Sequence, residues 1–268
     1  VQGGMYLRRQ DSASMAAFNQ QLKAGVQIRG MDFFLQRNIE RFDYLKLIER
    51  WSQHGAQVRV RPFDPRQFHA NSLIADFLAG FLGVRDLEGF SGTDATENAN
   101  PRLSSAALEF KLLINNLIPD IEASARFNDA LLAYDAVTEA DSKALYASHD
   151  TLSAWRQAEI MAQFQDSNRI IDARYLQDHA PYFAVTTDLP PVPGPAPGEA
   201  EQKRQRHDRL VDIARWLLQT DPGVAAAARA AAEAITGTEA VRIRSAANQM
   251  RQALDQAARQ LAAGPPKA

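Results

Sequence analysis

The sequence has no cysteine among its 268 residues. Disulfide bonds and thiolate-based metal or redox sites are therefore excluded. The five histidines are scattered, without HxxxH or HExxH spacing, and we expect no metal site. No run of about eighteen apolar residues occurs, so we expect no transmembrane segment. A signal-peptide pattern is also missing, and we expect a cytoplasmic protein.

An excess of charge of one sign is missing as well. The formal net charge is −2 and the pI is near 6.2, so we expect no nucleic-acid partner, because such proteins normally carry a strong basic excess. The sequence contains neither a GxSxG nucleophile elbow nor a GxxxxGK[ST] phosphate-binding loop. Apolar residues make up 46% of the chain, enough for one domain with an appendage or for two small domains.

The stretch from Gly4 to Gly25 predicts a strand followed by a helix. The apolar run Met5–Leu7 is typical of a buried strand, and Arg8 and Arg9 follow at its carboxyl end. Asp11 is a suitable N-cap for the helix, and Gly25 is suitable for its C′ position. One apolar helix face is formed by Met15, Phe18 and Leu22.

Two interpretations of Arg8 and Arg9 remain open at this point. A strand that delivers two guanidinium groups to a turn before a helix N-terminus forms a geometry suited to an anion. Alternatively, both arginines are solvated charges at a strand end.

A second strand is predicted at Gln57–Arg61. Asp43 is expected to cap the preceding helix, and Gly55 to end it. The alternation of valine and arginine within the strand has a period of two. Two strands separated by a helix predict a parallel βαβ unit. Arg59 and Arg61 share one strand face, where they line an anionic site or form a solvated or salt-bridged edge.

Mostly helices are predicted in the remainder. Residues 26–42 are interpreted as a loop with a helical turn, and residues 86–101 as a surface loop. A helix starting at Asn71 or Ser72 and closed by Gly83 carries a continuous apolar stripe. That stripe consists of Leu73, Ile74, Phe77, Leu78, Phe81 and Leu82. Later helices are expected at 104–117, 121–134, 139–147, 153–165 and around 171–175.

The C-terminal part changes in composition. Residues 189–198, LPPVPGPAPG, predict a semi-rigid linker between a domain at 1–188 and an Ala-rich helical extension at 199–268. The last helix has a coiled-coil-like seam, which indicates self-association through residues 238–263. The seam consists of Ile243, Ala247, Met250, Leu254, Ala257 and Leu261.

The run from Lys203 to Arg206 is interpreted either as a solvated face or as a contact with a polyanion.

The phrases YLRRQD and VRPFD, with a Tyr…Trp helix between them, resemble the bacterial sulfotransferase-like proteins found with surface-polysaccharide genes. The resemblance covers about Met5 to Phe183. It implies a partial P-loop-type parallel sheet within a predominantly helical α/β fold. It also implies a transferase, phosphoadenosine phosphosulfate as the sulfuryl donor, and a carbohydrate acceptor.

The resemblance also implies roles for individual residues. Arg8 or Arg9 matches the family's arginine for the 3′-phosphate of the donor, whereas the family's serine falls on Ala16 or Ala17 and is absent. The family's Gly-rich loop lies upstream of the first strand. The chain starts at Val1 rather than Met, and Met5 lies inside that strand. We therefore expect either the downstream part of a longer protein or an open reading frame that lost its beginning, and we expect this chain to be inactive alone.

Further candidates match the family only loosely. Asn168 and Arg174 are expected either in the site or as a helix cap and a surface charge. His69, which follows the second strand, is a candidate general base.

Three functions remain open. They are the remainder of a carbohydrate sulfotransferase, a non-catalytic helical binding or scaffold module, and a glycosyltransferase-related protein. The last would need an acidic DxD pair, which the sequence lacks.

Overall fold

The computed structural model describes residues 2–86, 101–138, 152–179, 181–183, 198–236 and 238–264. The chain is predominantly helical and contains one small parallel sheet. It divides into two compact units, which are described separately. Unit 1 comprises Val1–Ser14, Arg37–Asn100 and Leu152–Val192, and unit 2 comprises Met15–Gln36, Pro101–Thr151 and Pro193–Ala268.

The sheet of unit 1 confirms the predicted parallel pair of strands. Strand β1 (Gln2–Leu7) pairs in parallel with β2 (Gln57–Pro62), with Gln2 opposite Gln57 and Leu7 opposite Pro62. The connection runs through α1 (Gln10–Lys23), α2 (Met31–Asn38), a 3-10 turn and α3 (Tyr44–Gln53). Asp43 caps α3 as predicted, since its carboxylate accepts the Lys46 N–H at 3.4 Å.

The segment at residues 26–42, predicted as a loop with a helical turn, contains a longer, regular helix. Helix α2 spans eight residues there. Phe34 and Leu35 are 1% and 3% exposed, so burial of these two large side chains anchors the helix. The sequence pattern was too short to show this, because only one turn of α2 faces the core.

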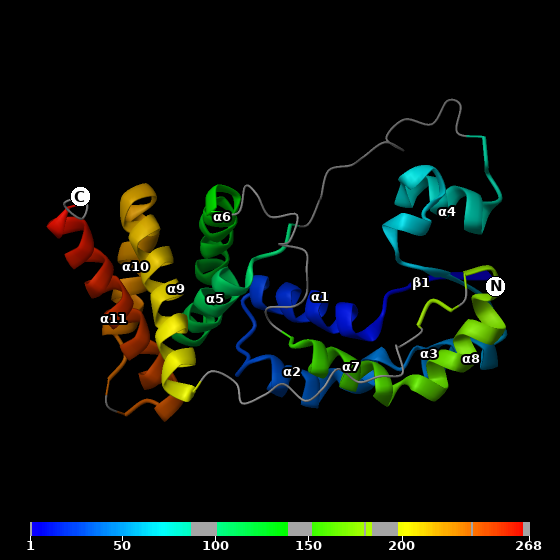
Figure 1. Cartoon of the computed structure of the whole chain (residues 1–268), viewed down its shortest axis with the longest axis horizontal. Coiled ribbons are helices and arrows are strands. Elements are labelled where there is room, and N and C mark those ends of the chain that lie inside the picture. The colour runs from blue at the N-terminus through cyan, green and yellow to red at the C-terminus, as the bar shows by residue number, and fades with distance from the viewer. Residues whose placement is uncertain are drawn as a thin grey trace. The chain divides into compact units, whose positions relative to one another are not determined.

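Helices α3, α7 (Ala154–Gln163) and α8 (Gln165–Tyr175) supply the core on one face of the sheet (Figure 1). Leu7 and Val60 point to this face from the two strands. Alternation along each strand sends Tyr6 and Arg61 to the opposite face. The buried members of the core are Leu7, Leu45, Ile48, Val60, Met161, Ile171, Leu176 and Phe183.

Helix α4 (Leu73–Leu82) lies on the opposite face, with Ser72 as its N-cap and Gly83 (φ 73°) at its end, as predicted. Two glycines permit its close approach. A Cβ atom on Gly4 would lie 2.9 Å from the Phe81 ring, and one on Gly80 would lie 2.5 Å from Cδ of Arg61.

The apolar stripe of α4 is not its buried face. Ala75 and Asp76 are the buried residues of the helix. Small residues let α4 approach the sheet, and Asp76 meets Arg61 there, so the ion pair decides which face turns inward. The exposed members of the predicted stripe are Leu73, Ile74, Phe77 and Leu82.

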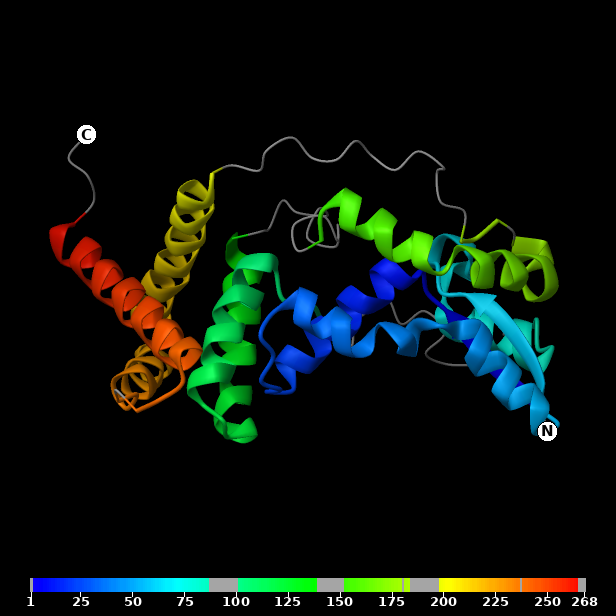
Figure 2. The same ribbon diagram turned by 90° about the horizontal axis from the view of Figure 1, so that it is seen from below.

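Unit 2 contains a group of packed helices (Figures 1 and 2). Helices α9 and α11 pack against each other and against α5, whose N-cap is Ser104 as predicted. Most of the predicted seam of α11 is buried within the chain, so self-association through 238–263 stays a prediction. The bounds are α5 Ser105–Leu117, α6 Ile121–Thr138, α9 Glu199–Thr220, α10 Pro222–Glu233 and α11 Val241–Ala263.

Some expectations lie outside the described residues. They are most of the loop at 86–101, the helix at 139–147 and nearly all of the linker at 189–198. The division into domains at that linker therefore stays a prediction. Where the structure describes the chain, no helix combines the length and apolar character that crossing a membrane requires.

Candidate anion site at the strand ends

The carboxyl ends of β1 and β2 meet at one edge of the sheet. The Phe63 N–H donates to the Leu7 carbonyl at 2.6 Å, which continues the pairing beyond β2. Arg8 and Arg9 leave β1 at this edge, and α1 begins at Gln10. The prediction of Asp11 as the N-cap was therefore wrong, because Asp11 lies inside the first turn of the helix.

Arg8 stacks on an aromatic ring. Its guanidinium carbon lies 4.3 Å from the centroid of Phe63, the first residue after β2. A guanidinium over an aromatic face is held in place by electrostatic attraction to the ring. The stacking thus fixes a half-buried cation at the strand ends.

Arg9 forms an ion pair within the turn. Its Nη2 lies 3.1 Å from Oδ2 of Asp11, and the two side chains are 36% and 10% exposed. Asp11 also accepts the Ser12 N–H at 2.7 Å. A carboxylate in the first turn of a helix offsets the positive end of the macrodipole. Asp11 therefore competes with any external anion for Arg9 and for the helix N-terminus.

Two phenols border the arginines. The Tyr182 hydroxyl donates to the Phe63 carbonyl at 3.4 Å and accepts a hydrogen bond from the Arg9 backbone. Burial, followed by the charge of Asp64, raises the pKa of Tyr182 to about 12, although Arg8 and Arg9 act in the opposite direction. Burial also raises the pKa of Tyr44, whereas Arg8 opposes this shift.

Asn168 contributes to this edge through Gln10, and its predicted role as a cap was wrong. It lies inside α8 and is 3% exposed. Its side-chain amide exchanges two hydrogen bonds with that of Gln10, at 2.6 and 3.1 Å. This pair fixes the start of α1 against α8. Arg174, the other residue suggested in this region, is exposed.

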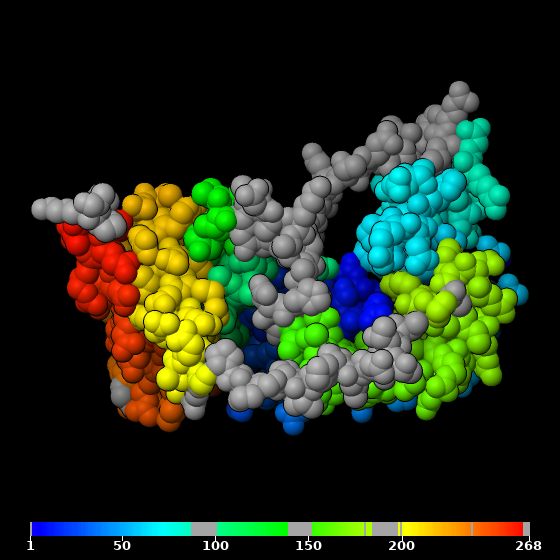
Figure 3. Space-filling view, viewed as in Figure 1, coloured from blue at the N-terminus to red at the C-terminus, as the bar shows by residue number. Residues whose placement is uncertain are grey.

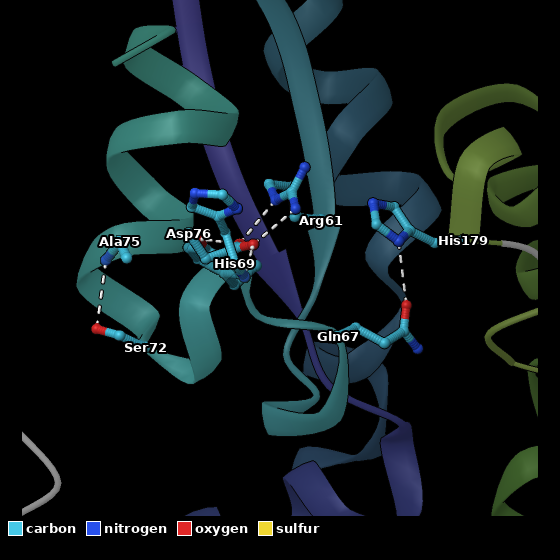
Figure 4. A network of polar contacts seen from close by, with 8 residues as sticks. Arg61, Gln67, His69, Ser72, Ala75, Asp76 and His179 are labelled. Atoms are coloured by element: carbon cyan, nitrogen blue, oxygen red, sulfur yellow. Dashed lines mark hydrogen bonds and ion pairs between the residues drawn. The ribbon is translucent and has the colours of Figure 1, made fainter. Parts of the chain in front are cut away.

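Arg61 belongs to a separate polar network on the α4 face of the sheet (Figure 4). Its Nε and Nη2 donate to the two carboxylate oxygens of Asp76, each at 2.7 Å. The Tyr6 hydroxyl and the His69 backbone N–H donate to the same carboxylate at 2.7 and 2.9 Å. The salt-bridged interpretation of Arg61 is thereby confirmed, whereas Arg59 is exposed.

The hydrogen bonds to Asp76 satisfy a carboxylate that is only 1% exposed. Asp76 has a lowered pKa because the hydrogen bonds from Arg61 and Tyr6 outweigh the opposing effect of burial, which is the largest single cause. The network therefore attaches α4 to β1 and β2, and we assign it a structural role.

His69 lies beside this network in a strained turn. The residues that follow it, Ala70 and Asn71, have φ angles of 50° and 55°, a region that costs non-glycine residues energy. The His69 side chain is exposed, and its role as a general base stays a prediction. His179 Nδ1 lies 3.1 Å from Oε1 of Gln67, and burial followed by the charge of Arg61 lowers the pKa of His179.

Comparisons with family models, with curated proteins and with solved structures found no match. The site is therefore interpreted from its geometry alone. Among the described residues, no group of His, Asp and Glu could hold a metal ion.

Sequence reasoning located Arg8 and Arg9 but missed the residues that surround them. Tyr182 and Phe63 stand 119 positions apart in the chain. No periodic pattern links such distant residues, and only the fold brings them to one edge. The aromatic pair Tyr182–Phe183 was the only local signal for an aromatic contribution from this part of the chain.

Proposed function

We propose that the strand-end edge of unit 1 binds a phosphate group of an adenine nucleotide, with Arg8 as its main ligand. The observation that carries the proposal is the parallel pairing of β1 with β2. In open α/β sheets, ligands bind outside the carboxyl ends of parallel strands. Here that edge carries two arginines and the start of a helix.

The aromatic surroundings support a nucleotide rather than a bare phosphate. Phe63 and Tyr182 lie beside the arginines, and aromatic rings offer stacking surfaces to a base or a sugar. The finer proposal is that unit 1 is part of a P-loop-type, sulfotransferase-like sheet. The bound group is then the 3′-phosphate of phosphoadenosine phosphosulfate, with a carbohydrate as the acceptor.

The site offers candidate ligands to only one end of this donor, the 3′-phosphate end. The 3′-phosphate would be held by Arg8 and, against competition from Asp11, by Arg9. The sequence has Ala16 and Ala17 where the family has its serine, and it lacks a Gly-rich loop for the phosphosulfate end. The proposal therefore covers nucleotide binding and assigns no catalytic residue.

The ion pair between Arg9 and Asp11 favours a second candidate function. A donor site in which Arg9 is already matched by a carboxylate suits a non-catalytic relative. Such a protein would act as a binding or scaffold module in surface-polysaccharide biosynthesis. Under this alternative, nucleotide binding is weak or absent.

Calorimetric titration with adenosine 3′,5′-bisphosphate tests the proposal. A charge-assisted contact is worth about 1.5–3 kcal/mol, so Arg8→Gln should weaken binding about tenfold or more. Arg59→Gln is the matched control, because it removes an exposed arginine from β2 and should leave the affinity unchanged. Adenosine 5′-monophosphate, which lacks the 3′-phosphate, should bind more weakly. Equal affinities of wild type and Arg8→Gln for the nucleotide would contradict the assignment of Arg8 as the main phosphate ligand.

A turnover assay with phosphoadenosine phosphosulfate and polysaccharide acceptors tests whether this chain binds the nucleotide without transferring sulfate. Removing one preorganised donor to the moving group commonly lowers the rate about a hundredfold or more. We expect no sulfate incorporation above background from the 268-residue chain alone. Robust incorporation would show that another segment supplies the donor site.

A further inference from the structure

The Tyr182 hydroxyl bridges the two strand ends of unit 1. Its oxygen accepts the Arg9 backbone N–H, which follows β1, and its proton is directed to the Phe63 carbonyl, which follows β2. The second bond is 3.4 Å long, whereas O–H···O bonds between good partners are about 2.7–2.8 Å. The oxygen is therefore held in place while the proton is only weakly bonded, and a hydroxyl can rotate its proton toward a better acceptor.

The backbone of Tyr182 is fixed by Asp172 of α8, a helix at the surface of the molecule (Figure 3). The two carboxylate oxygens of Asp172 accept the N–H groups of Tyr182 and Phe183, at 3.2 and 3.3 Å. Phe183 is 2% exposed in the core, and its ring packs edge-on against the Tyr182 ring with 4.9 Å between the centroids. The phenol is therefore preorganised at the strand ends, so an incoming ligand loses little free energy in ordering it.

Phe63 brings this phenol and a cation together. Its ring lies 4.3 Å from the Arg8 guanidinium carbon, and its carbonyl accepts the Tyr182 proton. An anion at this edge therefore finds a positive charge in Arg8 and a directional neutral donor in Tyr182. Asp64 is an opposing charge that acts on Tyr182, and its ion pair with Arg66 at 2.8 Å offsets it.

The bonding capacity of a phosphate monoester matches these two donors. Such a group has three acceptor oxygens, so it can accept from Arg8 and Tyr182 at the same time. Hydrogen bonds to ionised oxygens are shorter and stronger than those between neutral groups, so the weak bond to the Phe63 carbonyl is readily exchanged for one to the phosphate. Because burial raises the pKa of Tyr182 to about 12, the phenol retains its proton for this bond at neutral pH.

We propose that the Tyr182 hydroxyl is a second ligand of the phosphate bound at the strand ends, and that Asp172 is its positioning residue. This role rests on the proposed function, because Tyr182 contacts the same phosphate as Arg8. On binding, the Tyr182 proton turns from the Phe63 carbonyl to a phosphate oxygen, while the phenol oxygen keeps the Arg9 N–H. Recognition thus joins the turn after β1 to the segment that follows α8.

Calorimetric titration of the full chain with adenosine 3′,5′-bisphosphate tests this role. Tyr182→Phe removes only the hydroxyl and should weaken binding about tenfold. Tyr175→Phe is the matched control, because Tyr175 lies on α8 and its hydroxyl has no hydrogen-bond partner among the described residues. It should bind as wild type does. An affinity of Tyr182→Phe equal to that of wild type would overturn the proposal. Tighter binding would overturn it too, by showing that the hydroxyl competes with the phosphate for the Arg9 N–H.

Carbon-13 NMR of the tyrosine Cζ atoms reports on the hydroxyl groups directly, with the Tyr182 resonance assigned through Tyr182→Phe. We expect the Tyr182 resonance to shift saturably as the nucleotide is added, and the Tyr175 resonance to stay unchanged. An unmoved Tyr182 resonance in a chain that binds the nucleotide would overturn the role of Tyr182 alone. A wild-type chain that binds no nucleotide would overturn the proposed function as well.

Asp172→Asn tests the positioning role. The amide has one acceptor oxygen in place of two, so Tyr182 is held less firmly and nucleotide binding should weaken. In the Tyr182→Phe background, the same substitution should lower the affinity no further. A purely structural role of Asp172 would change the affinity equally in both backgrounds, and that result would contradict the positioning role.

Discussion

Unit 1 holds a partly buried cation and unit 2 a fully buried one, and the two are stabilised in opposite ways. In unit 1, Arg61 meets the carboxylate of Asp76 through two hydrogen bonds of 2.7 Å. In unit 2, Lys111 is fully buried on α5, and its ammonium group donates to the carbonyl and hydroxyl oxygens of Ser124. Among the described residues, no carboxylate bonds to Lys111.

The two cations differ in pKa accordingly. The hydrogen bond to Asp76 raises the pKa of Arg61, whereas burial lowers the pKa of Lys111 to about 8. The ion pair adds to an intrinsic difference, because a guanidinium group is effectively always protonated, whereas a buried ammonium group without a carboxylate can lose its proton. Arg61 is a fixed structural charge, and Lys111 is a titratable one.

The network around Lys111 stabilises a helix end rather than a sheet. The Ser124 hydroxyl donates to Oδ1 of Asn115 at 2.6 Å. The Asn115 amide in turn donates to the carbonyls of Leu22 and Val26, at 2.8 and 3.1 Å. The Leu22 carbonyl belongs to the last turn of α1, and Val26 follows Gly25, which has a φ of 78° at the C′ position, as predicted. Unit 2 therefore uses neutral groups where unit 1 uses an ion pair.

The largest expected effect is that of Asp76→Ala. This change leaves Arg61 partly buried without its carboxylate and removes the acceptor of Tyr6 and of the His69 N–H. Breaking a buried ion pair on one side commonly costs 3–5 kcal/mol, and we expect about 3 kcal/mol. Urea denaturation measures the loss. Hydrogen exchange should show faster exchange in β1 and β2, with α5 unchanged.

Asp64→Ala is the control for that variant. Asp64 pairs with Arg66, whose side chain is 89% exposed, and accepts the Arg66 N–H, so its removal should cost clearly less than that of Asp76. If the two variants were equally stable, the Arg61–Asp76 pair would have no special structural role.

Asn115→Ala should destabilise unit 2 by about 1–3 kcal/mol, because it removes the amide that donates to the Leu22 and Val26 carbonyls and the acceptor of the Ser124 hydroxyl. Hydrogen exchange at the C-terminal turn of α1 reports the change. Asn116→Ala on the same helix is the control, since the Asn116 amide bonds only to the carbonyl of Leu112 in its own helix. Equal effects of both variants would contradict the proposed role of Asn115.

Lys111→Met should stabilise unit 2 by about 2 kcal/mol at pH 7, because a buried cation without a carboxylate is replaced by an apolar side chain of similar length. The advantage should shrink as the pH rises above about 8, where folded Lys111 loses its proton. Between that value and 10.5 the unfolded chain binds the extra proton, so wild-type stability rises with pH relative to the variant. Thermal unfolding at pH 7 and pH 9.5 measures the difference. A constant difference would show that Lys111 does not titrate there.

Tyr6→Phe should have the smallest effect, a loss of about 0.5–1.5 kcal/mol. The substitution removes one of the hydrogen bonds to Asp76 but keeps Arg61 and the ring contacts with Phe81 and Phe68. Urea denaturation of Tyr6→Phe and of Asp76→Ala under the same conditions measures the two losses in the free energy of unfolding. A loss as large as that of Asp76→Ala would mean that the hydroxyl, rather than the ion pair, holds α4 to the sheet.

Local patterns predicted the elements of this fold well. Alternation of valine and arginine located β2, an apolar run located β1, and the intervening helix implied their parallel pairing. Glycines and capping residues also marked helix ends, as at Gly83 and Ser104. These signals succeed because they depend on residues within a few positions of each other.

The errors arose where distant residues decide the outcome. The apolar stripe of α4 did not show which face is buried, because that face is set by the pairing of Asp76 with Arg61, fifteen positions away. Asn168 served as a partner for Gln10, 158 positions away, rather than as a cap. For the same reason, the sequence located the arginines of the candidate site but not Tyr182.

We propose that the strand-end Arg8 binds the phosphate, whereas the ion-paired Arg61 does not. NMR of the arginine Nε–H groups during titration with adenosine 3′,5′-bisphosphate tests both parts, with resonances assigned through Arg8→Gln and Arg61→Lys. We expect a saturable shift of the Arg8 resonance as the nucleotide is added, and an unchanged Arg61 resonance. A shift of Arg61 with Arg8 unmoved would contradict it.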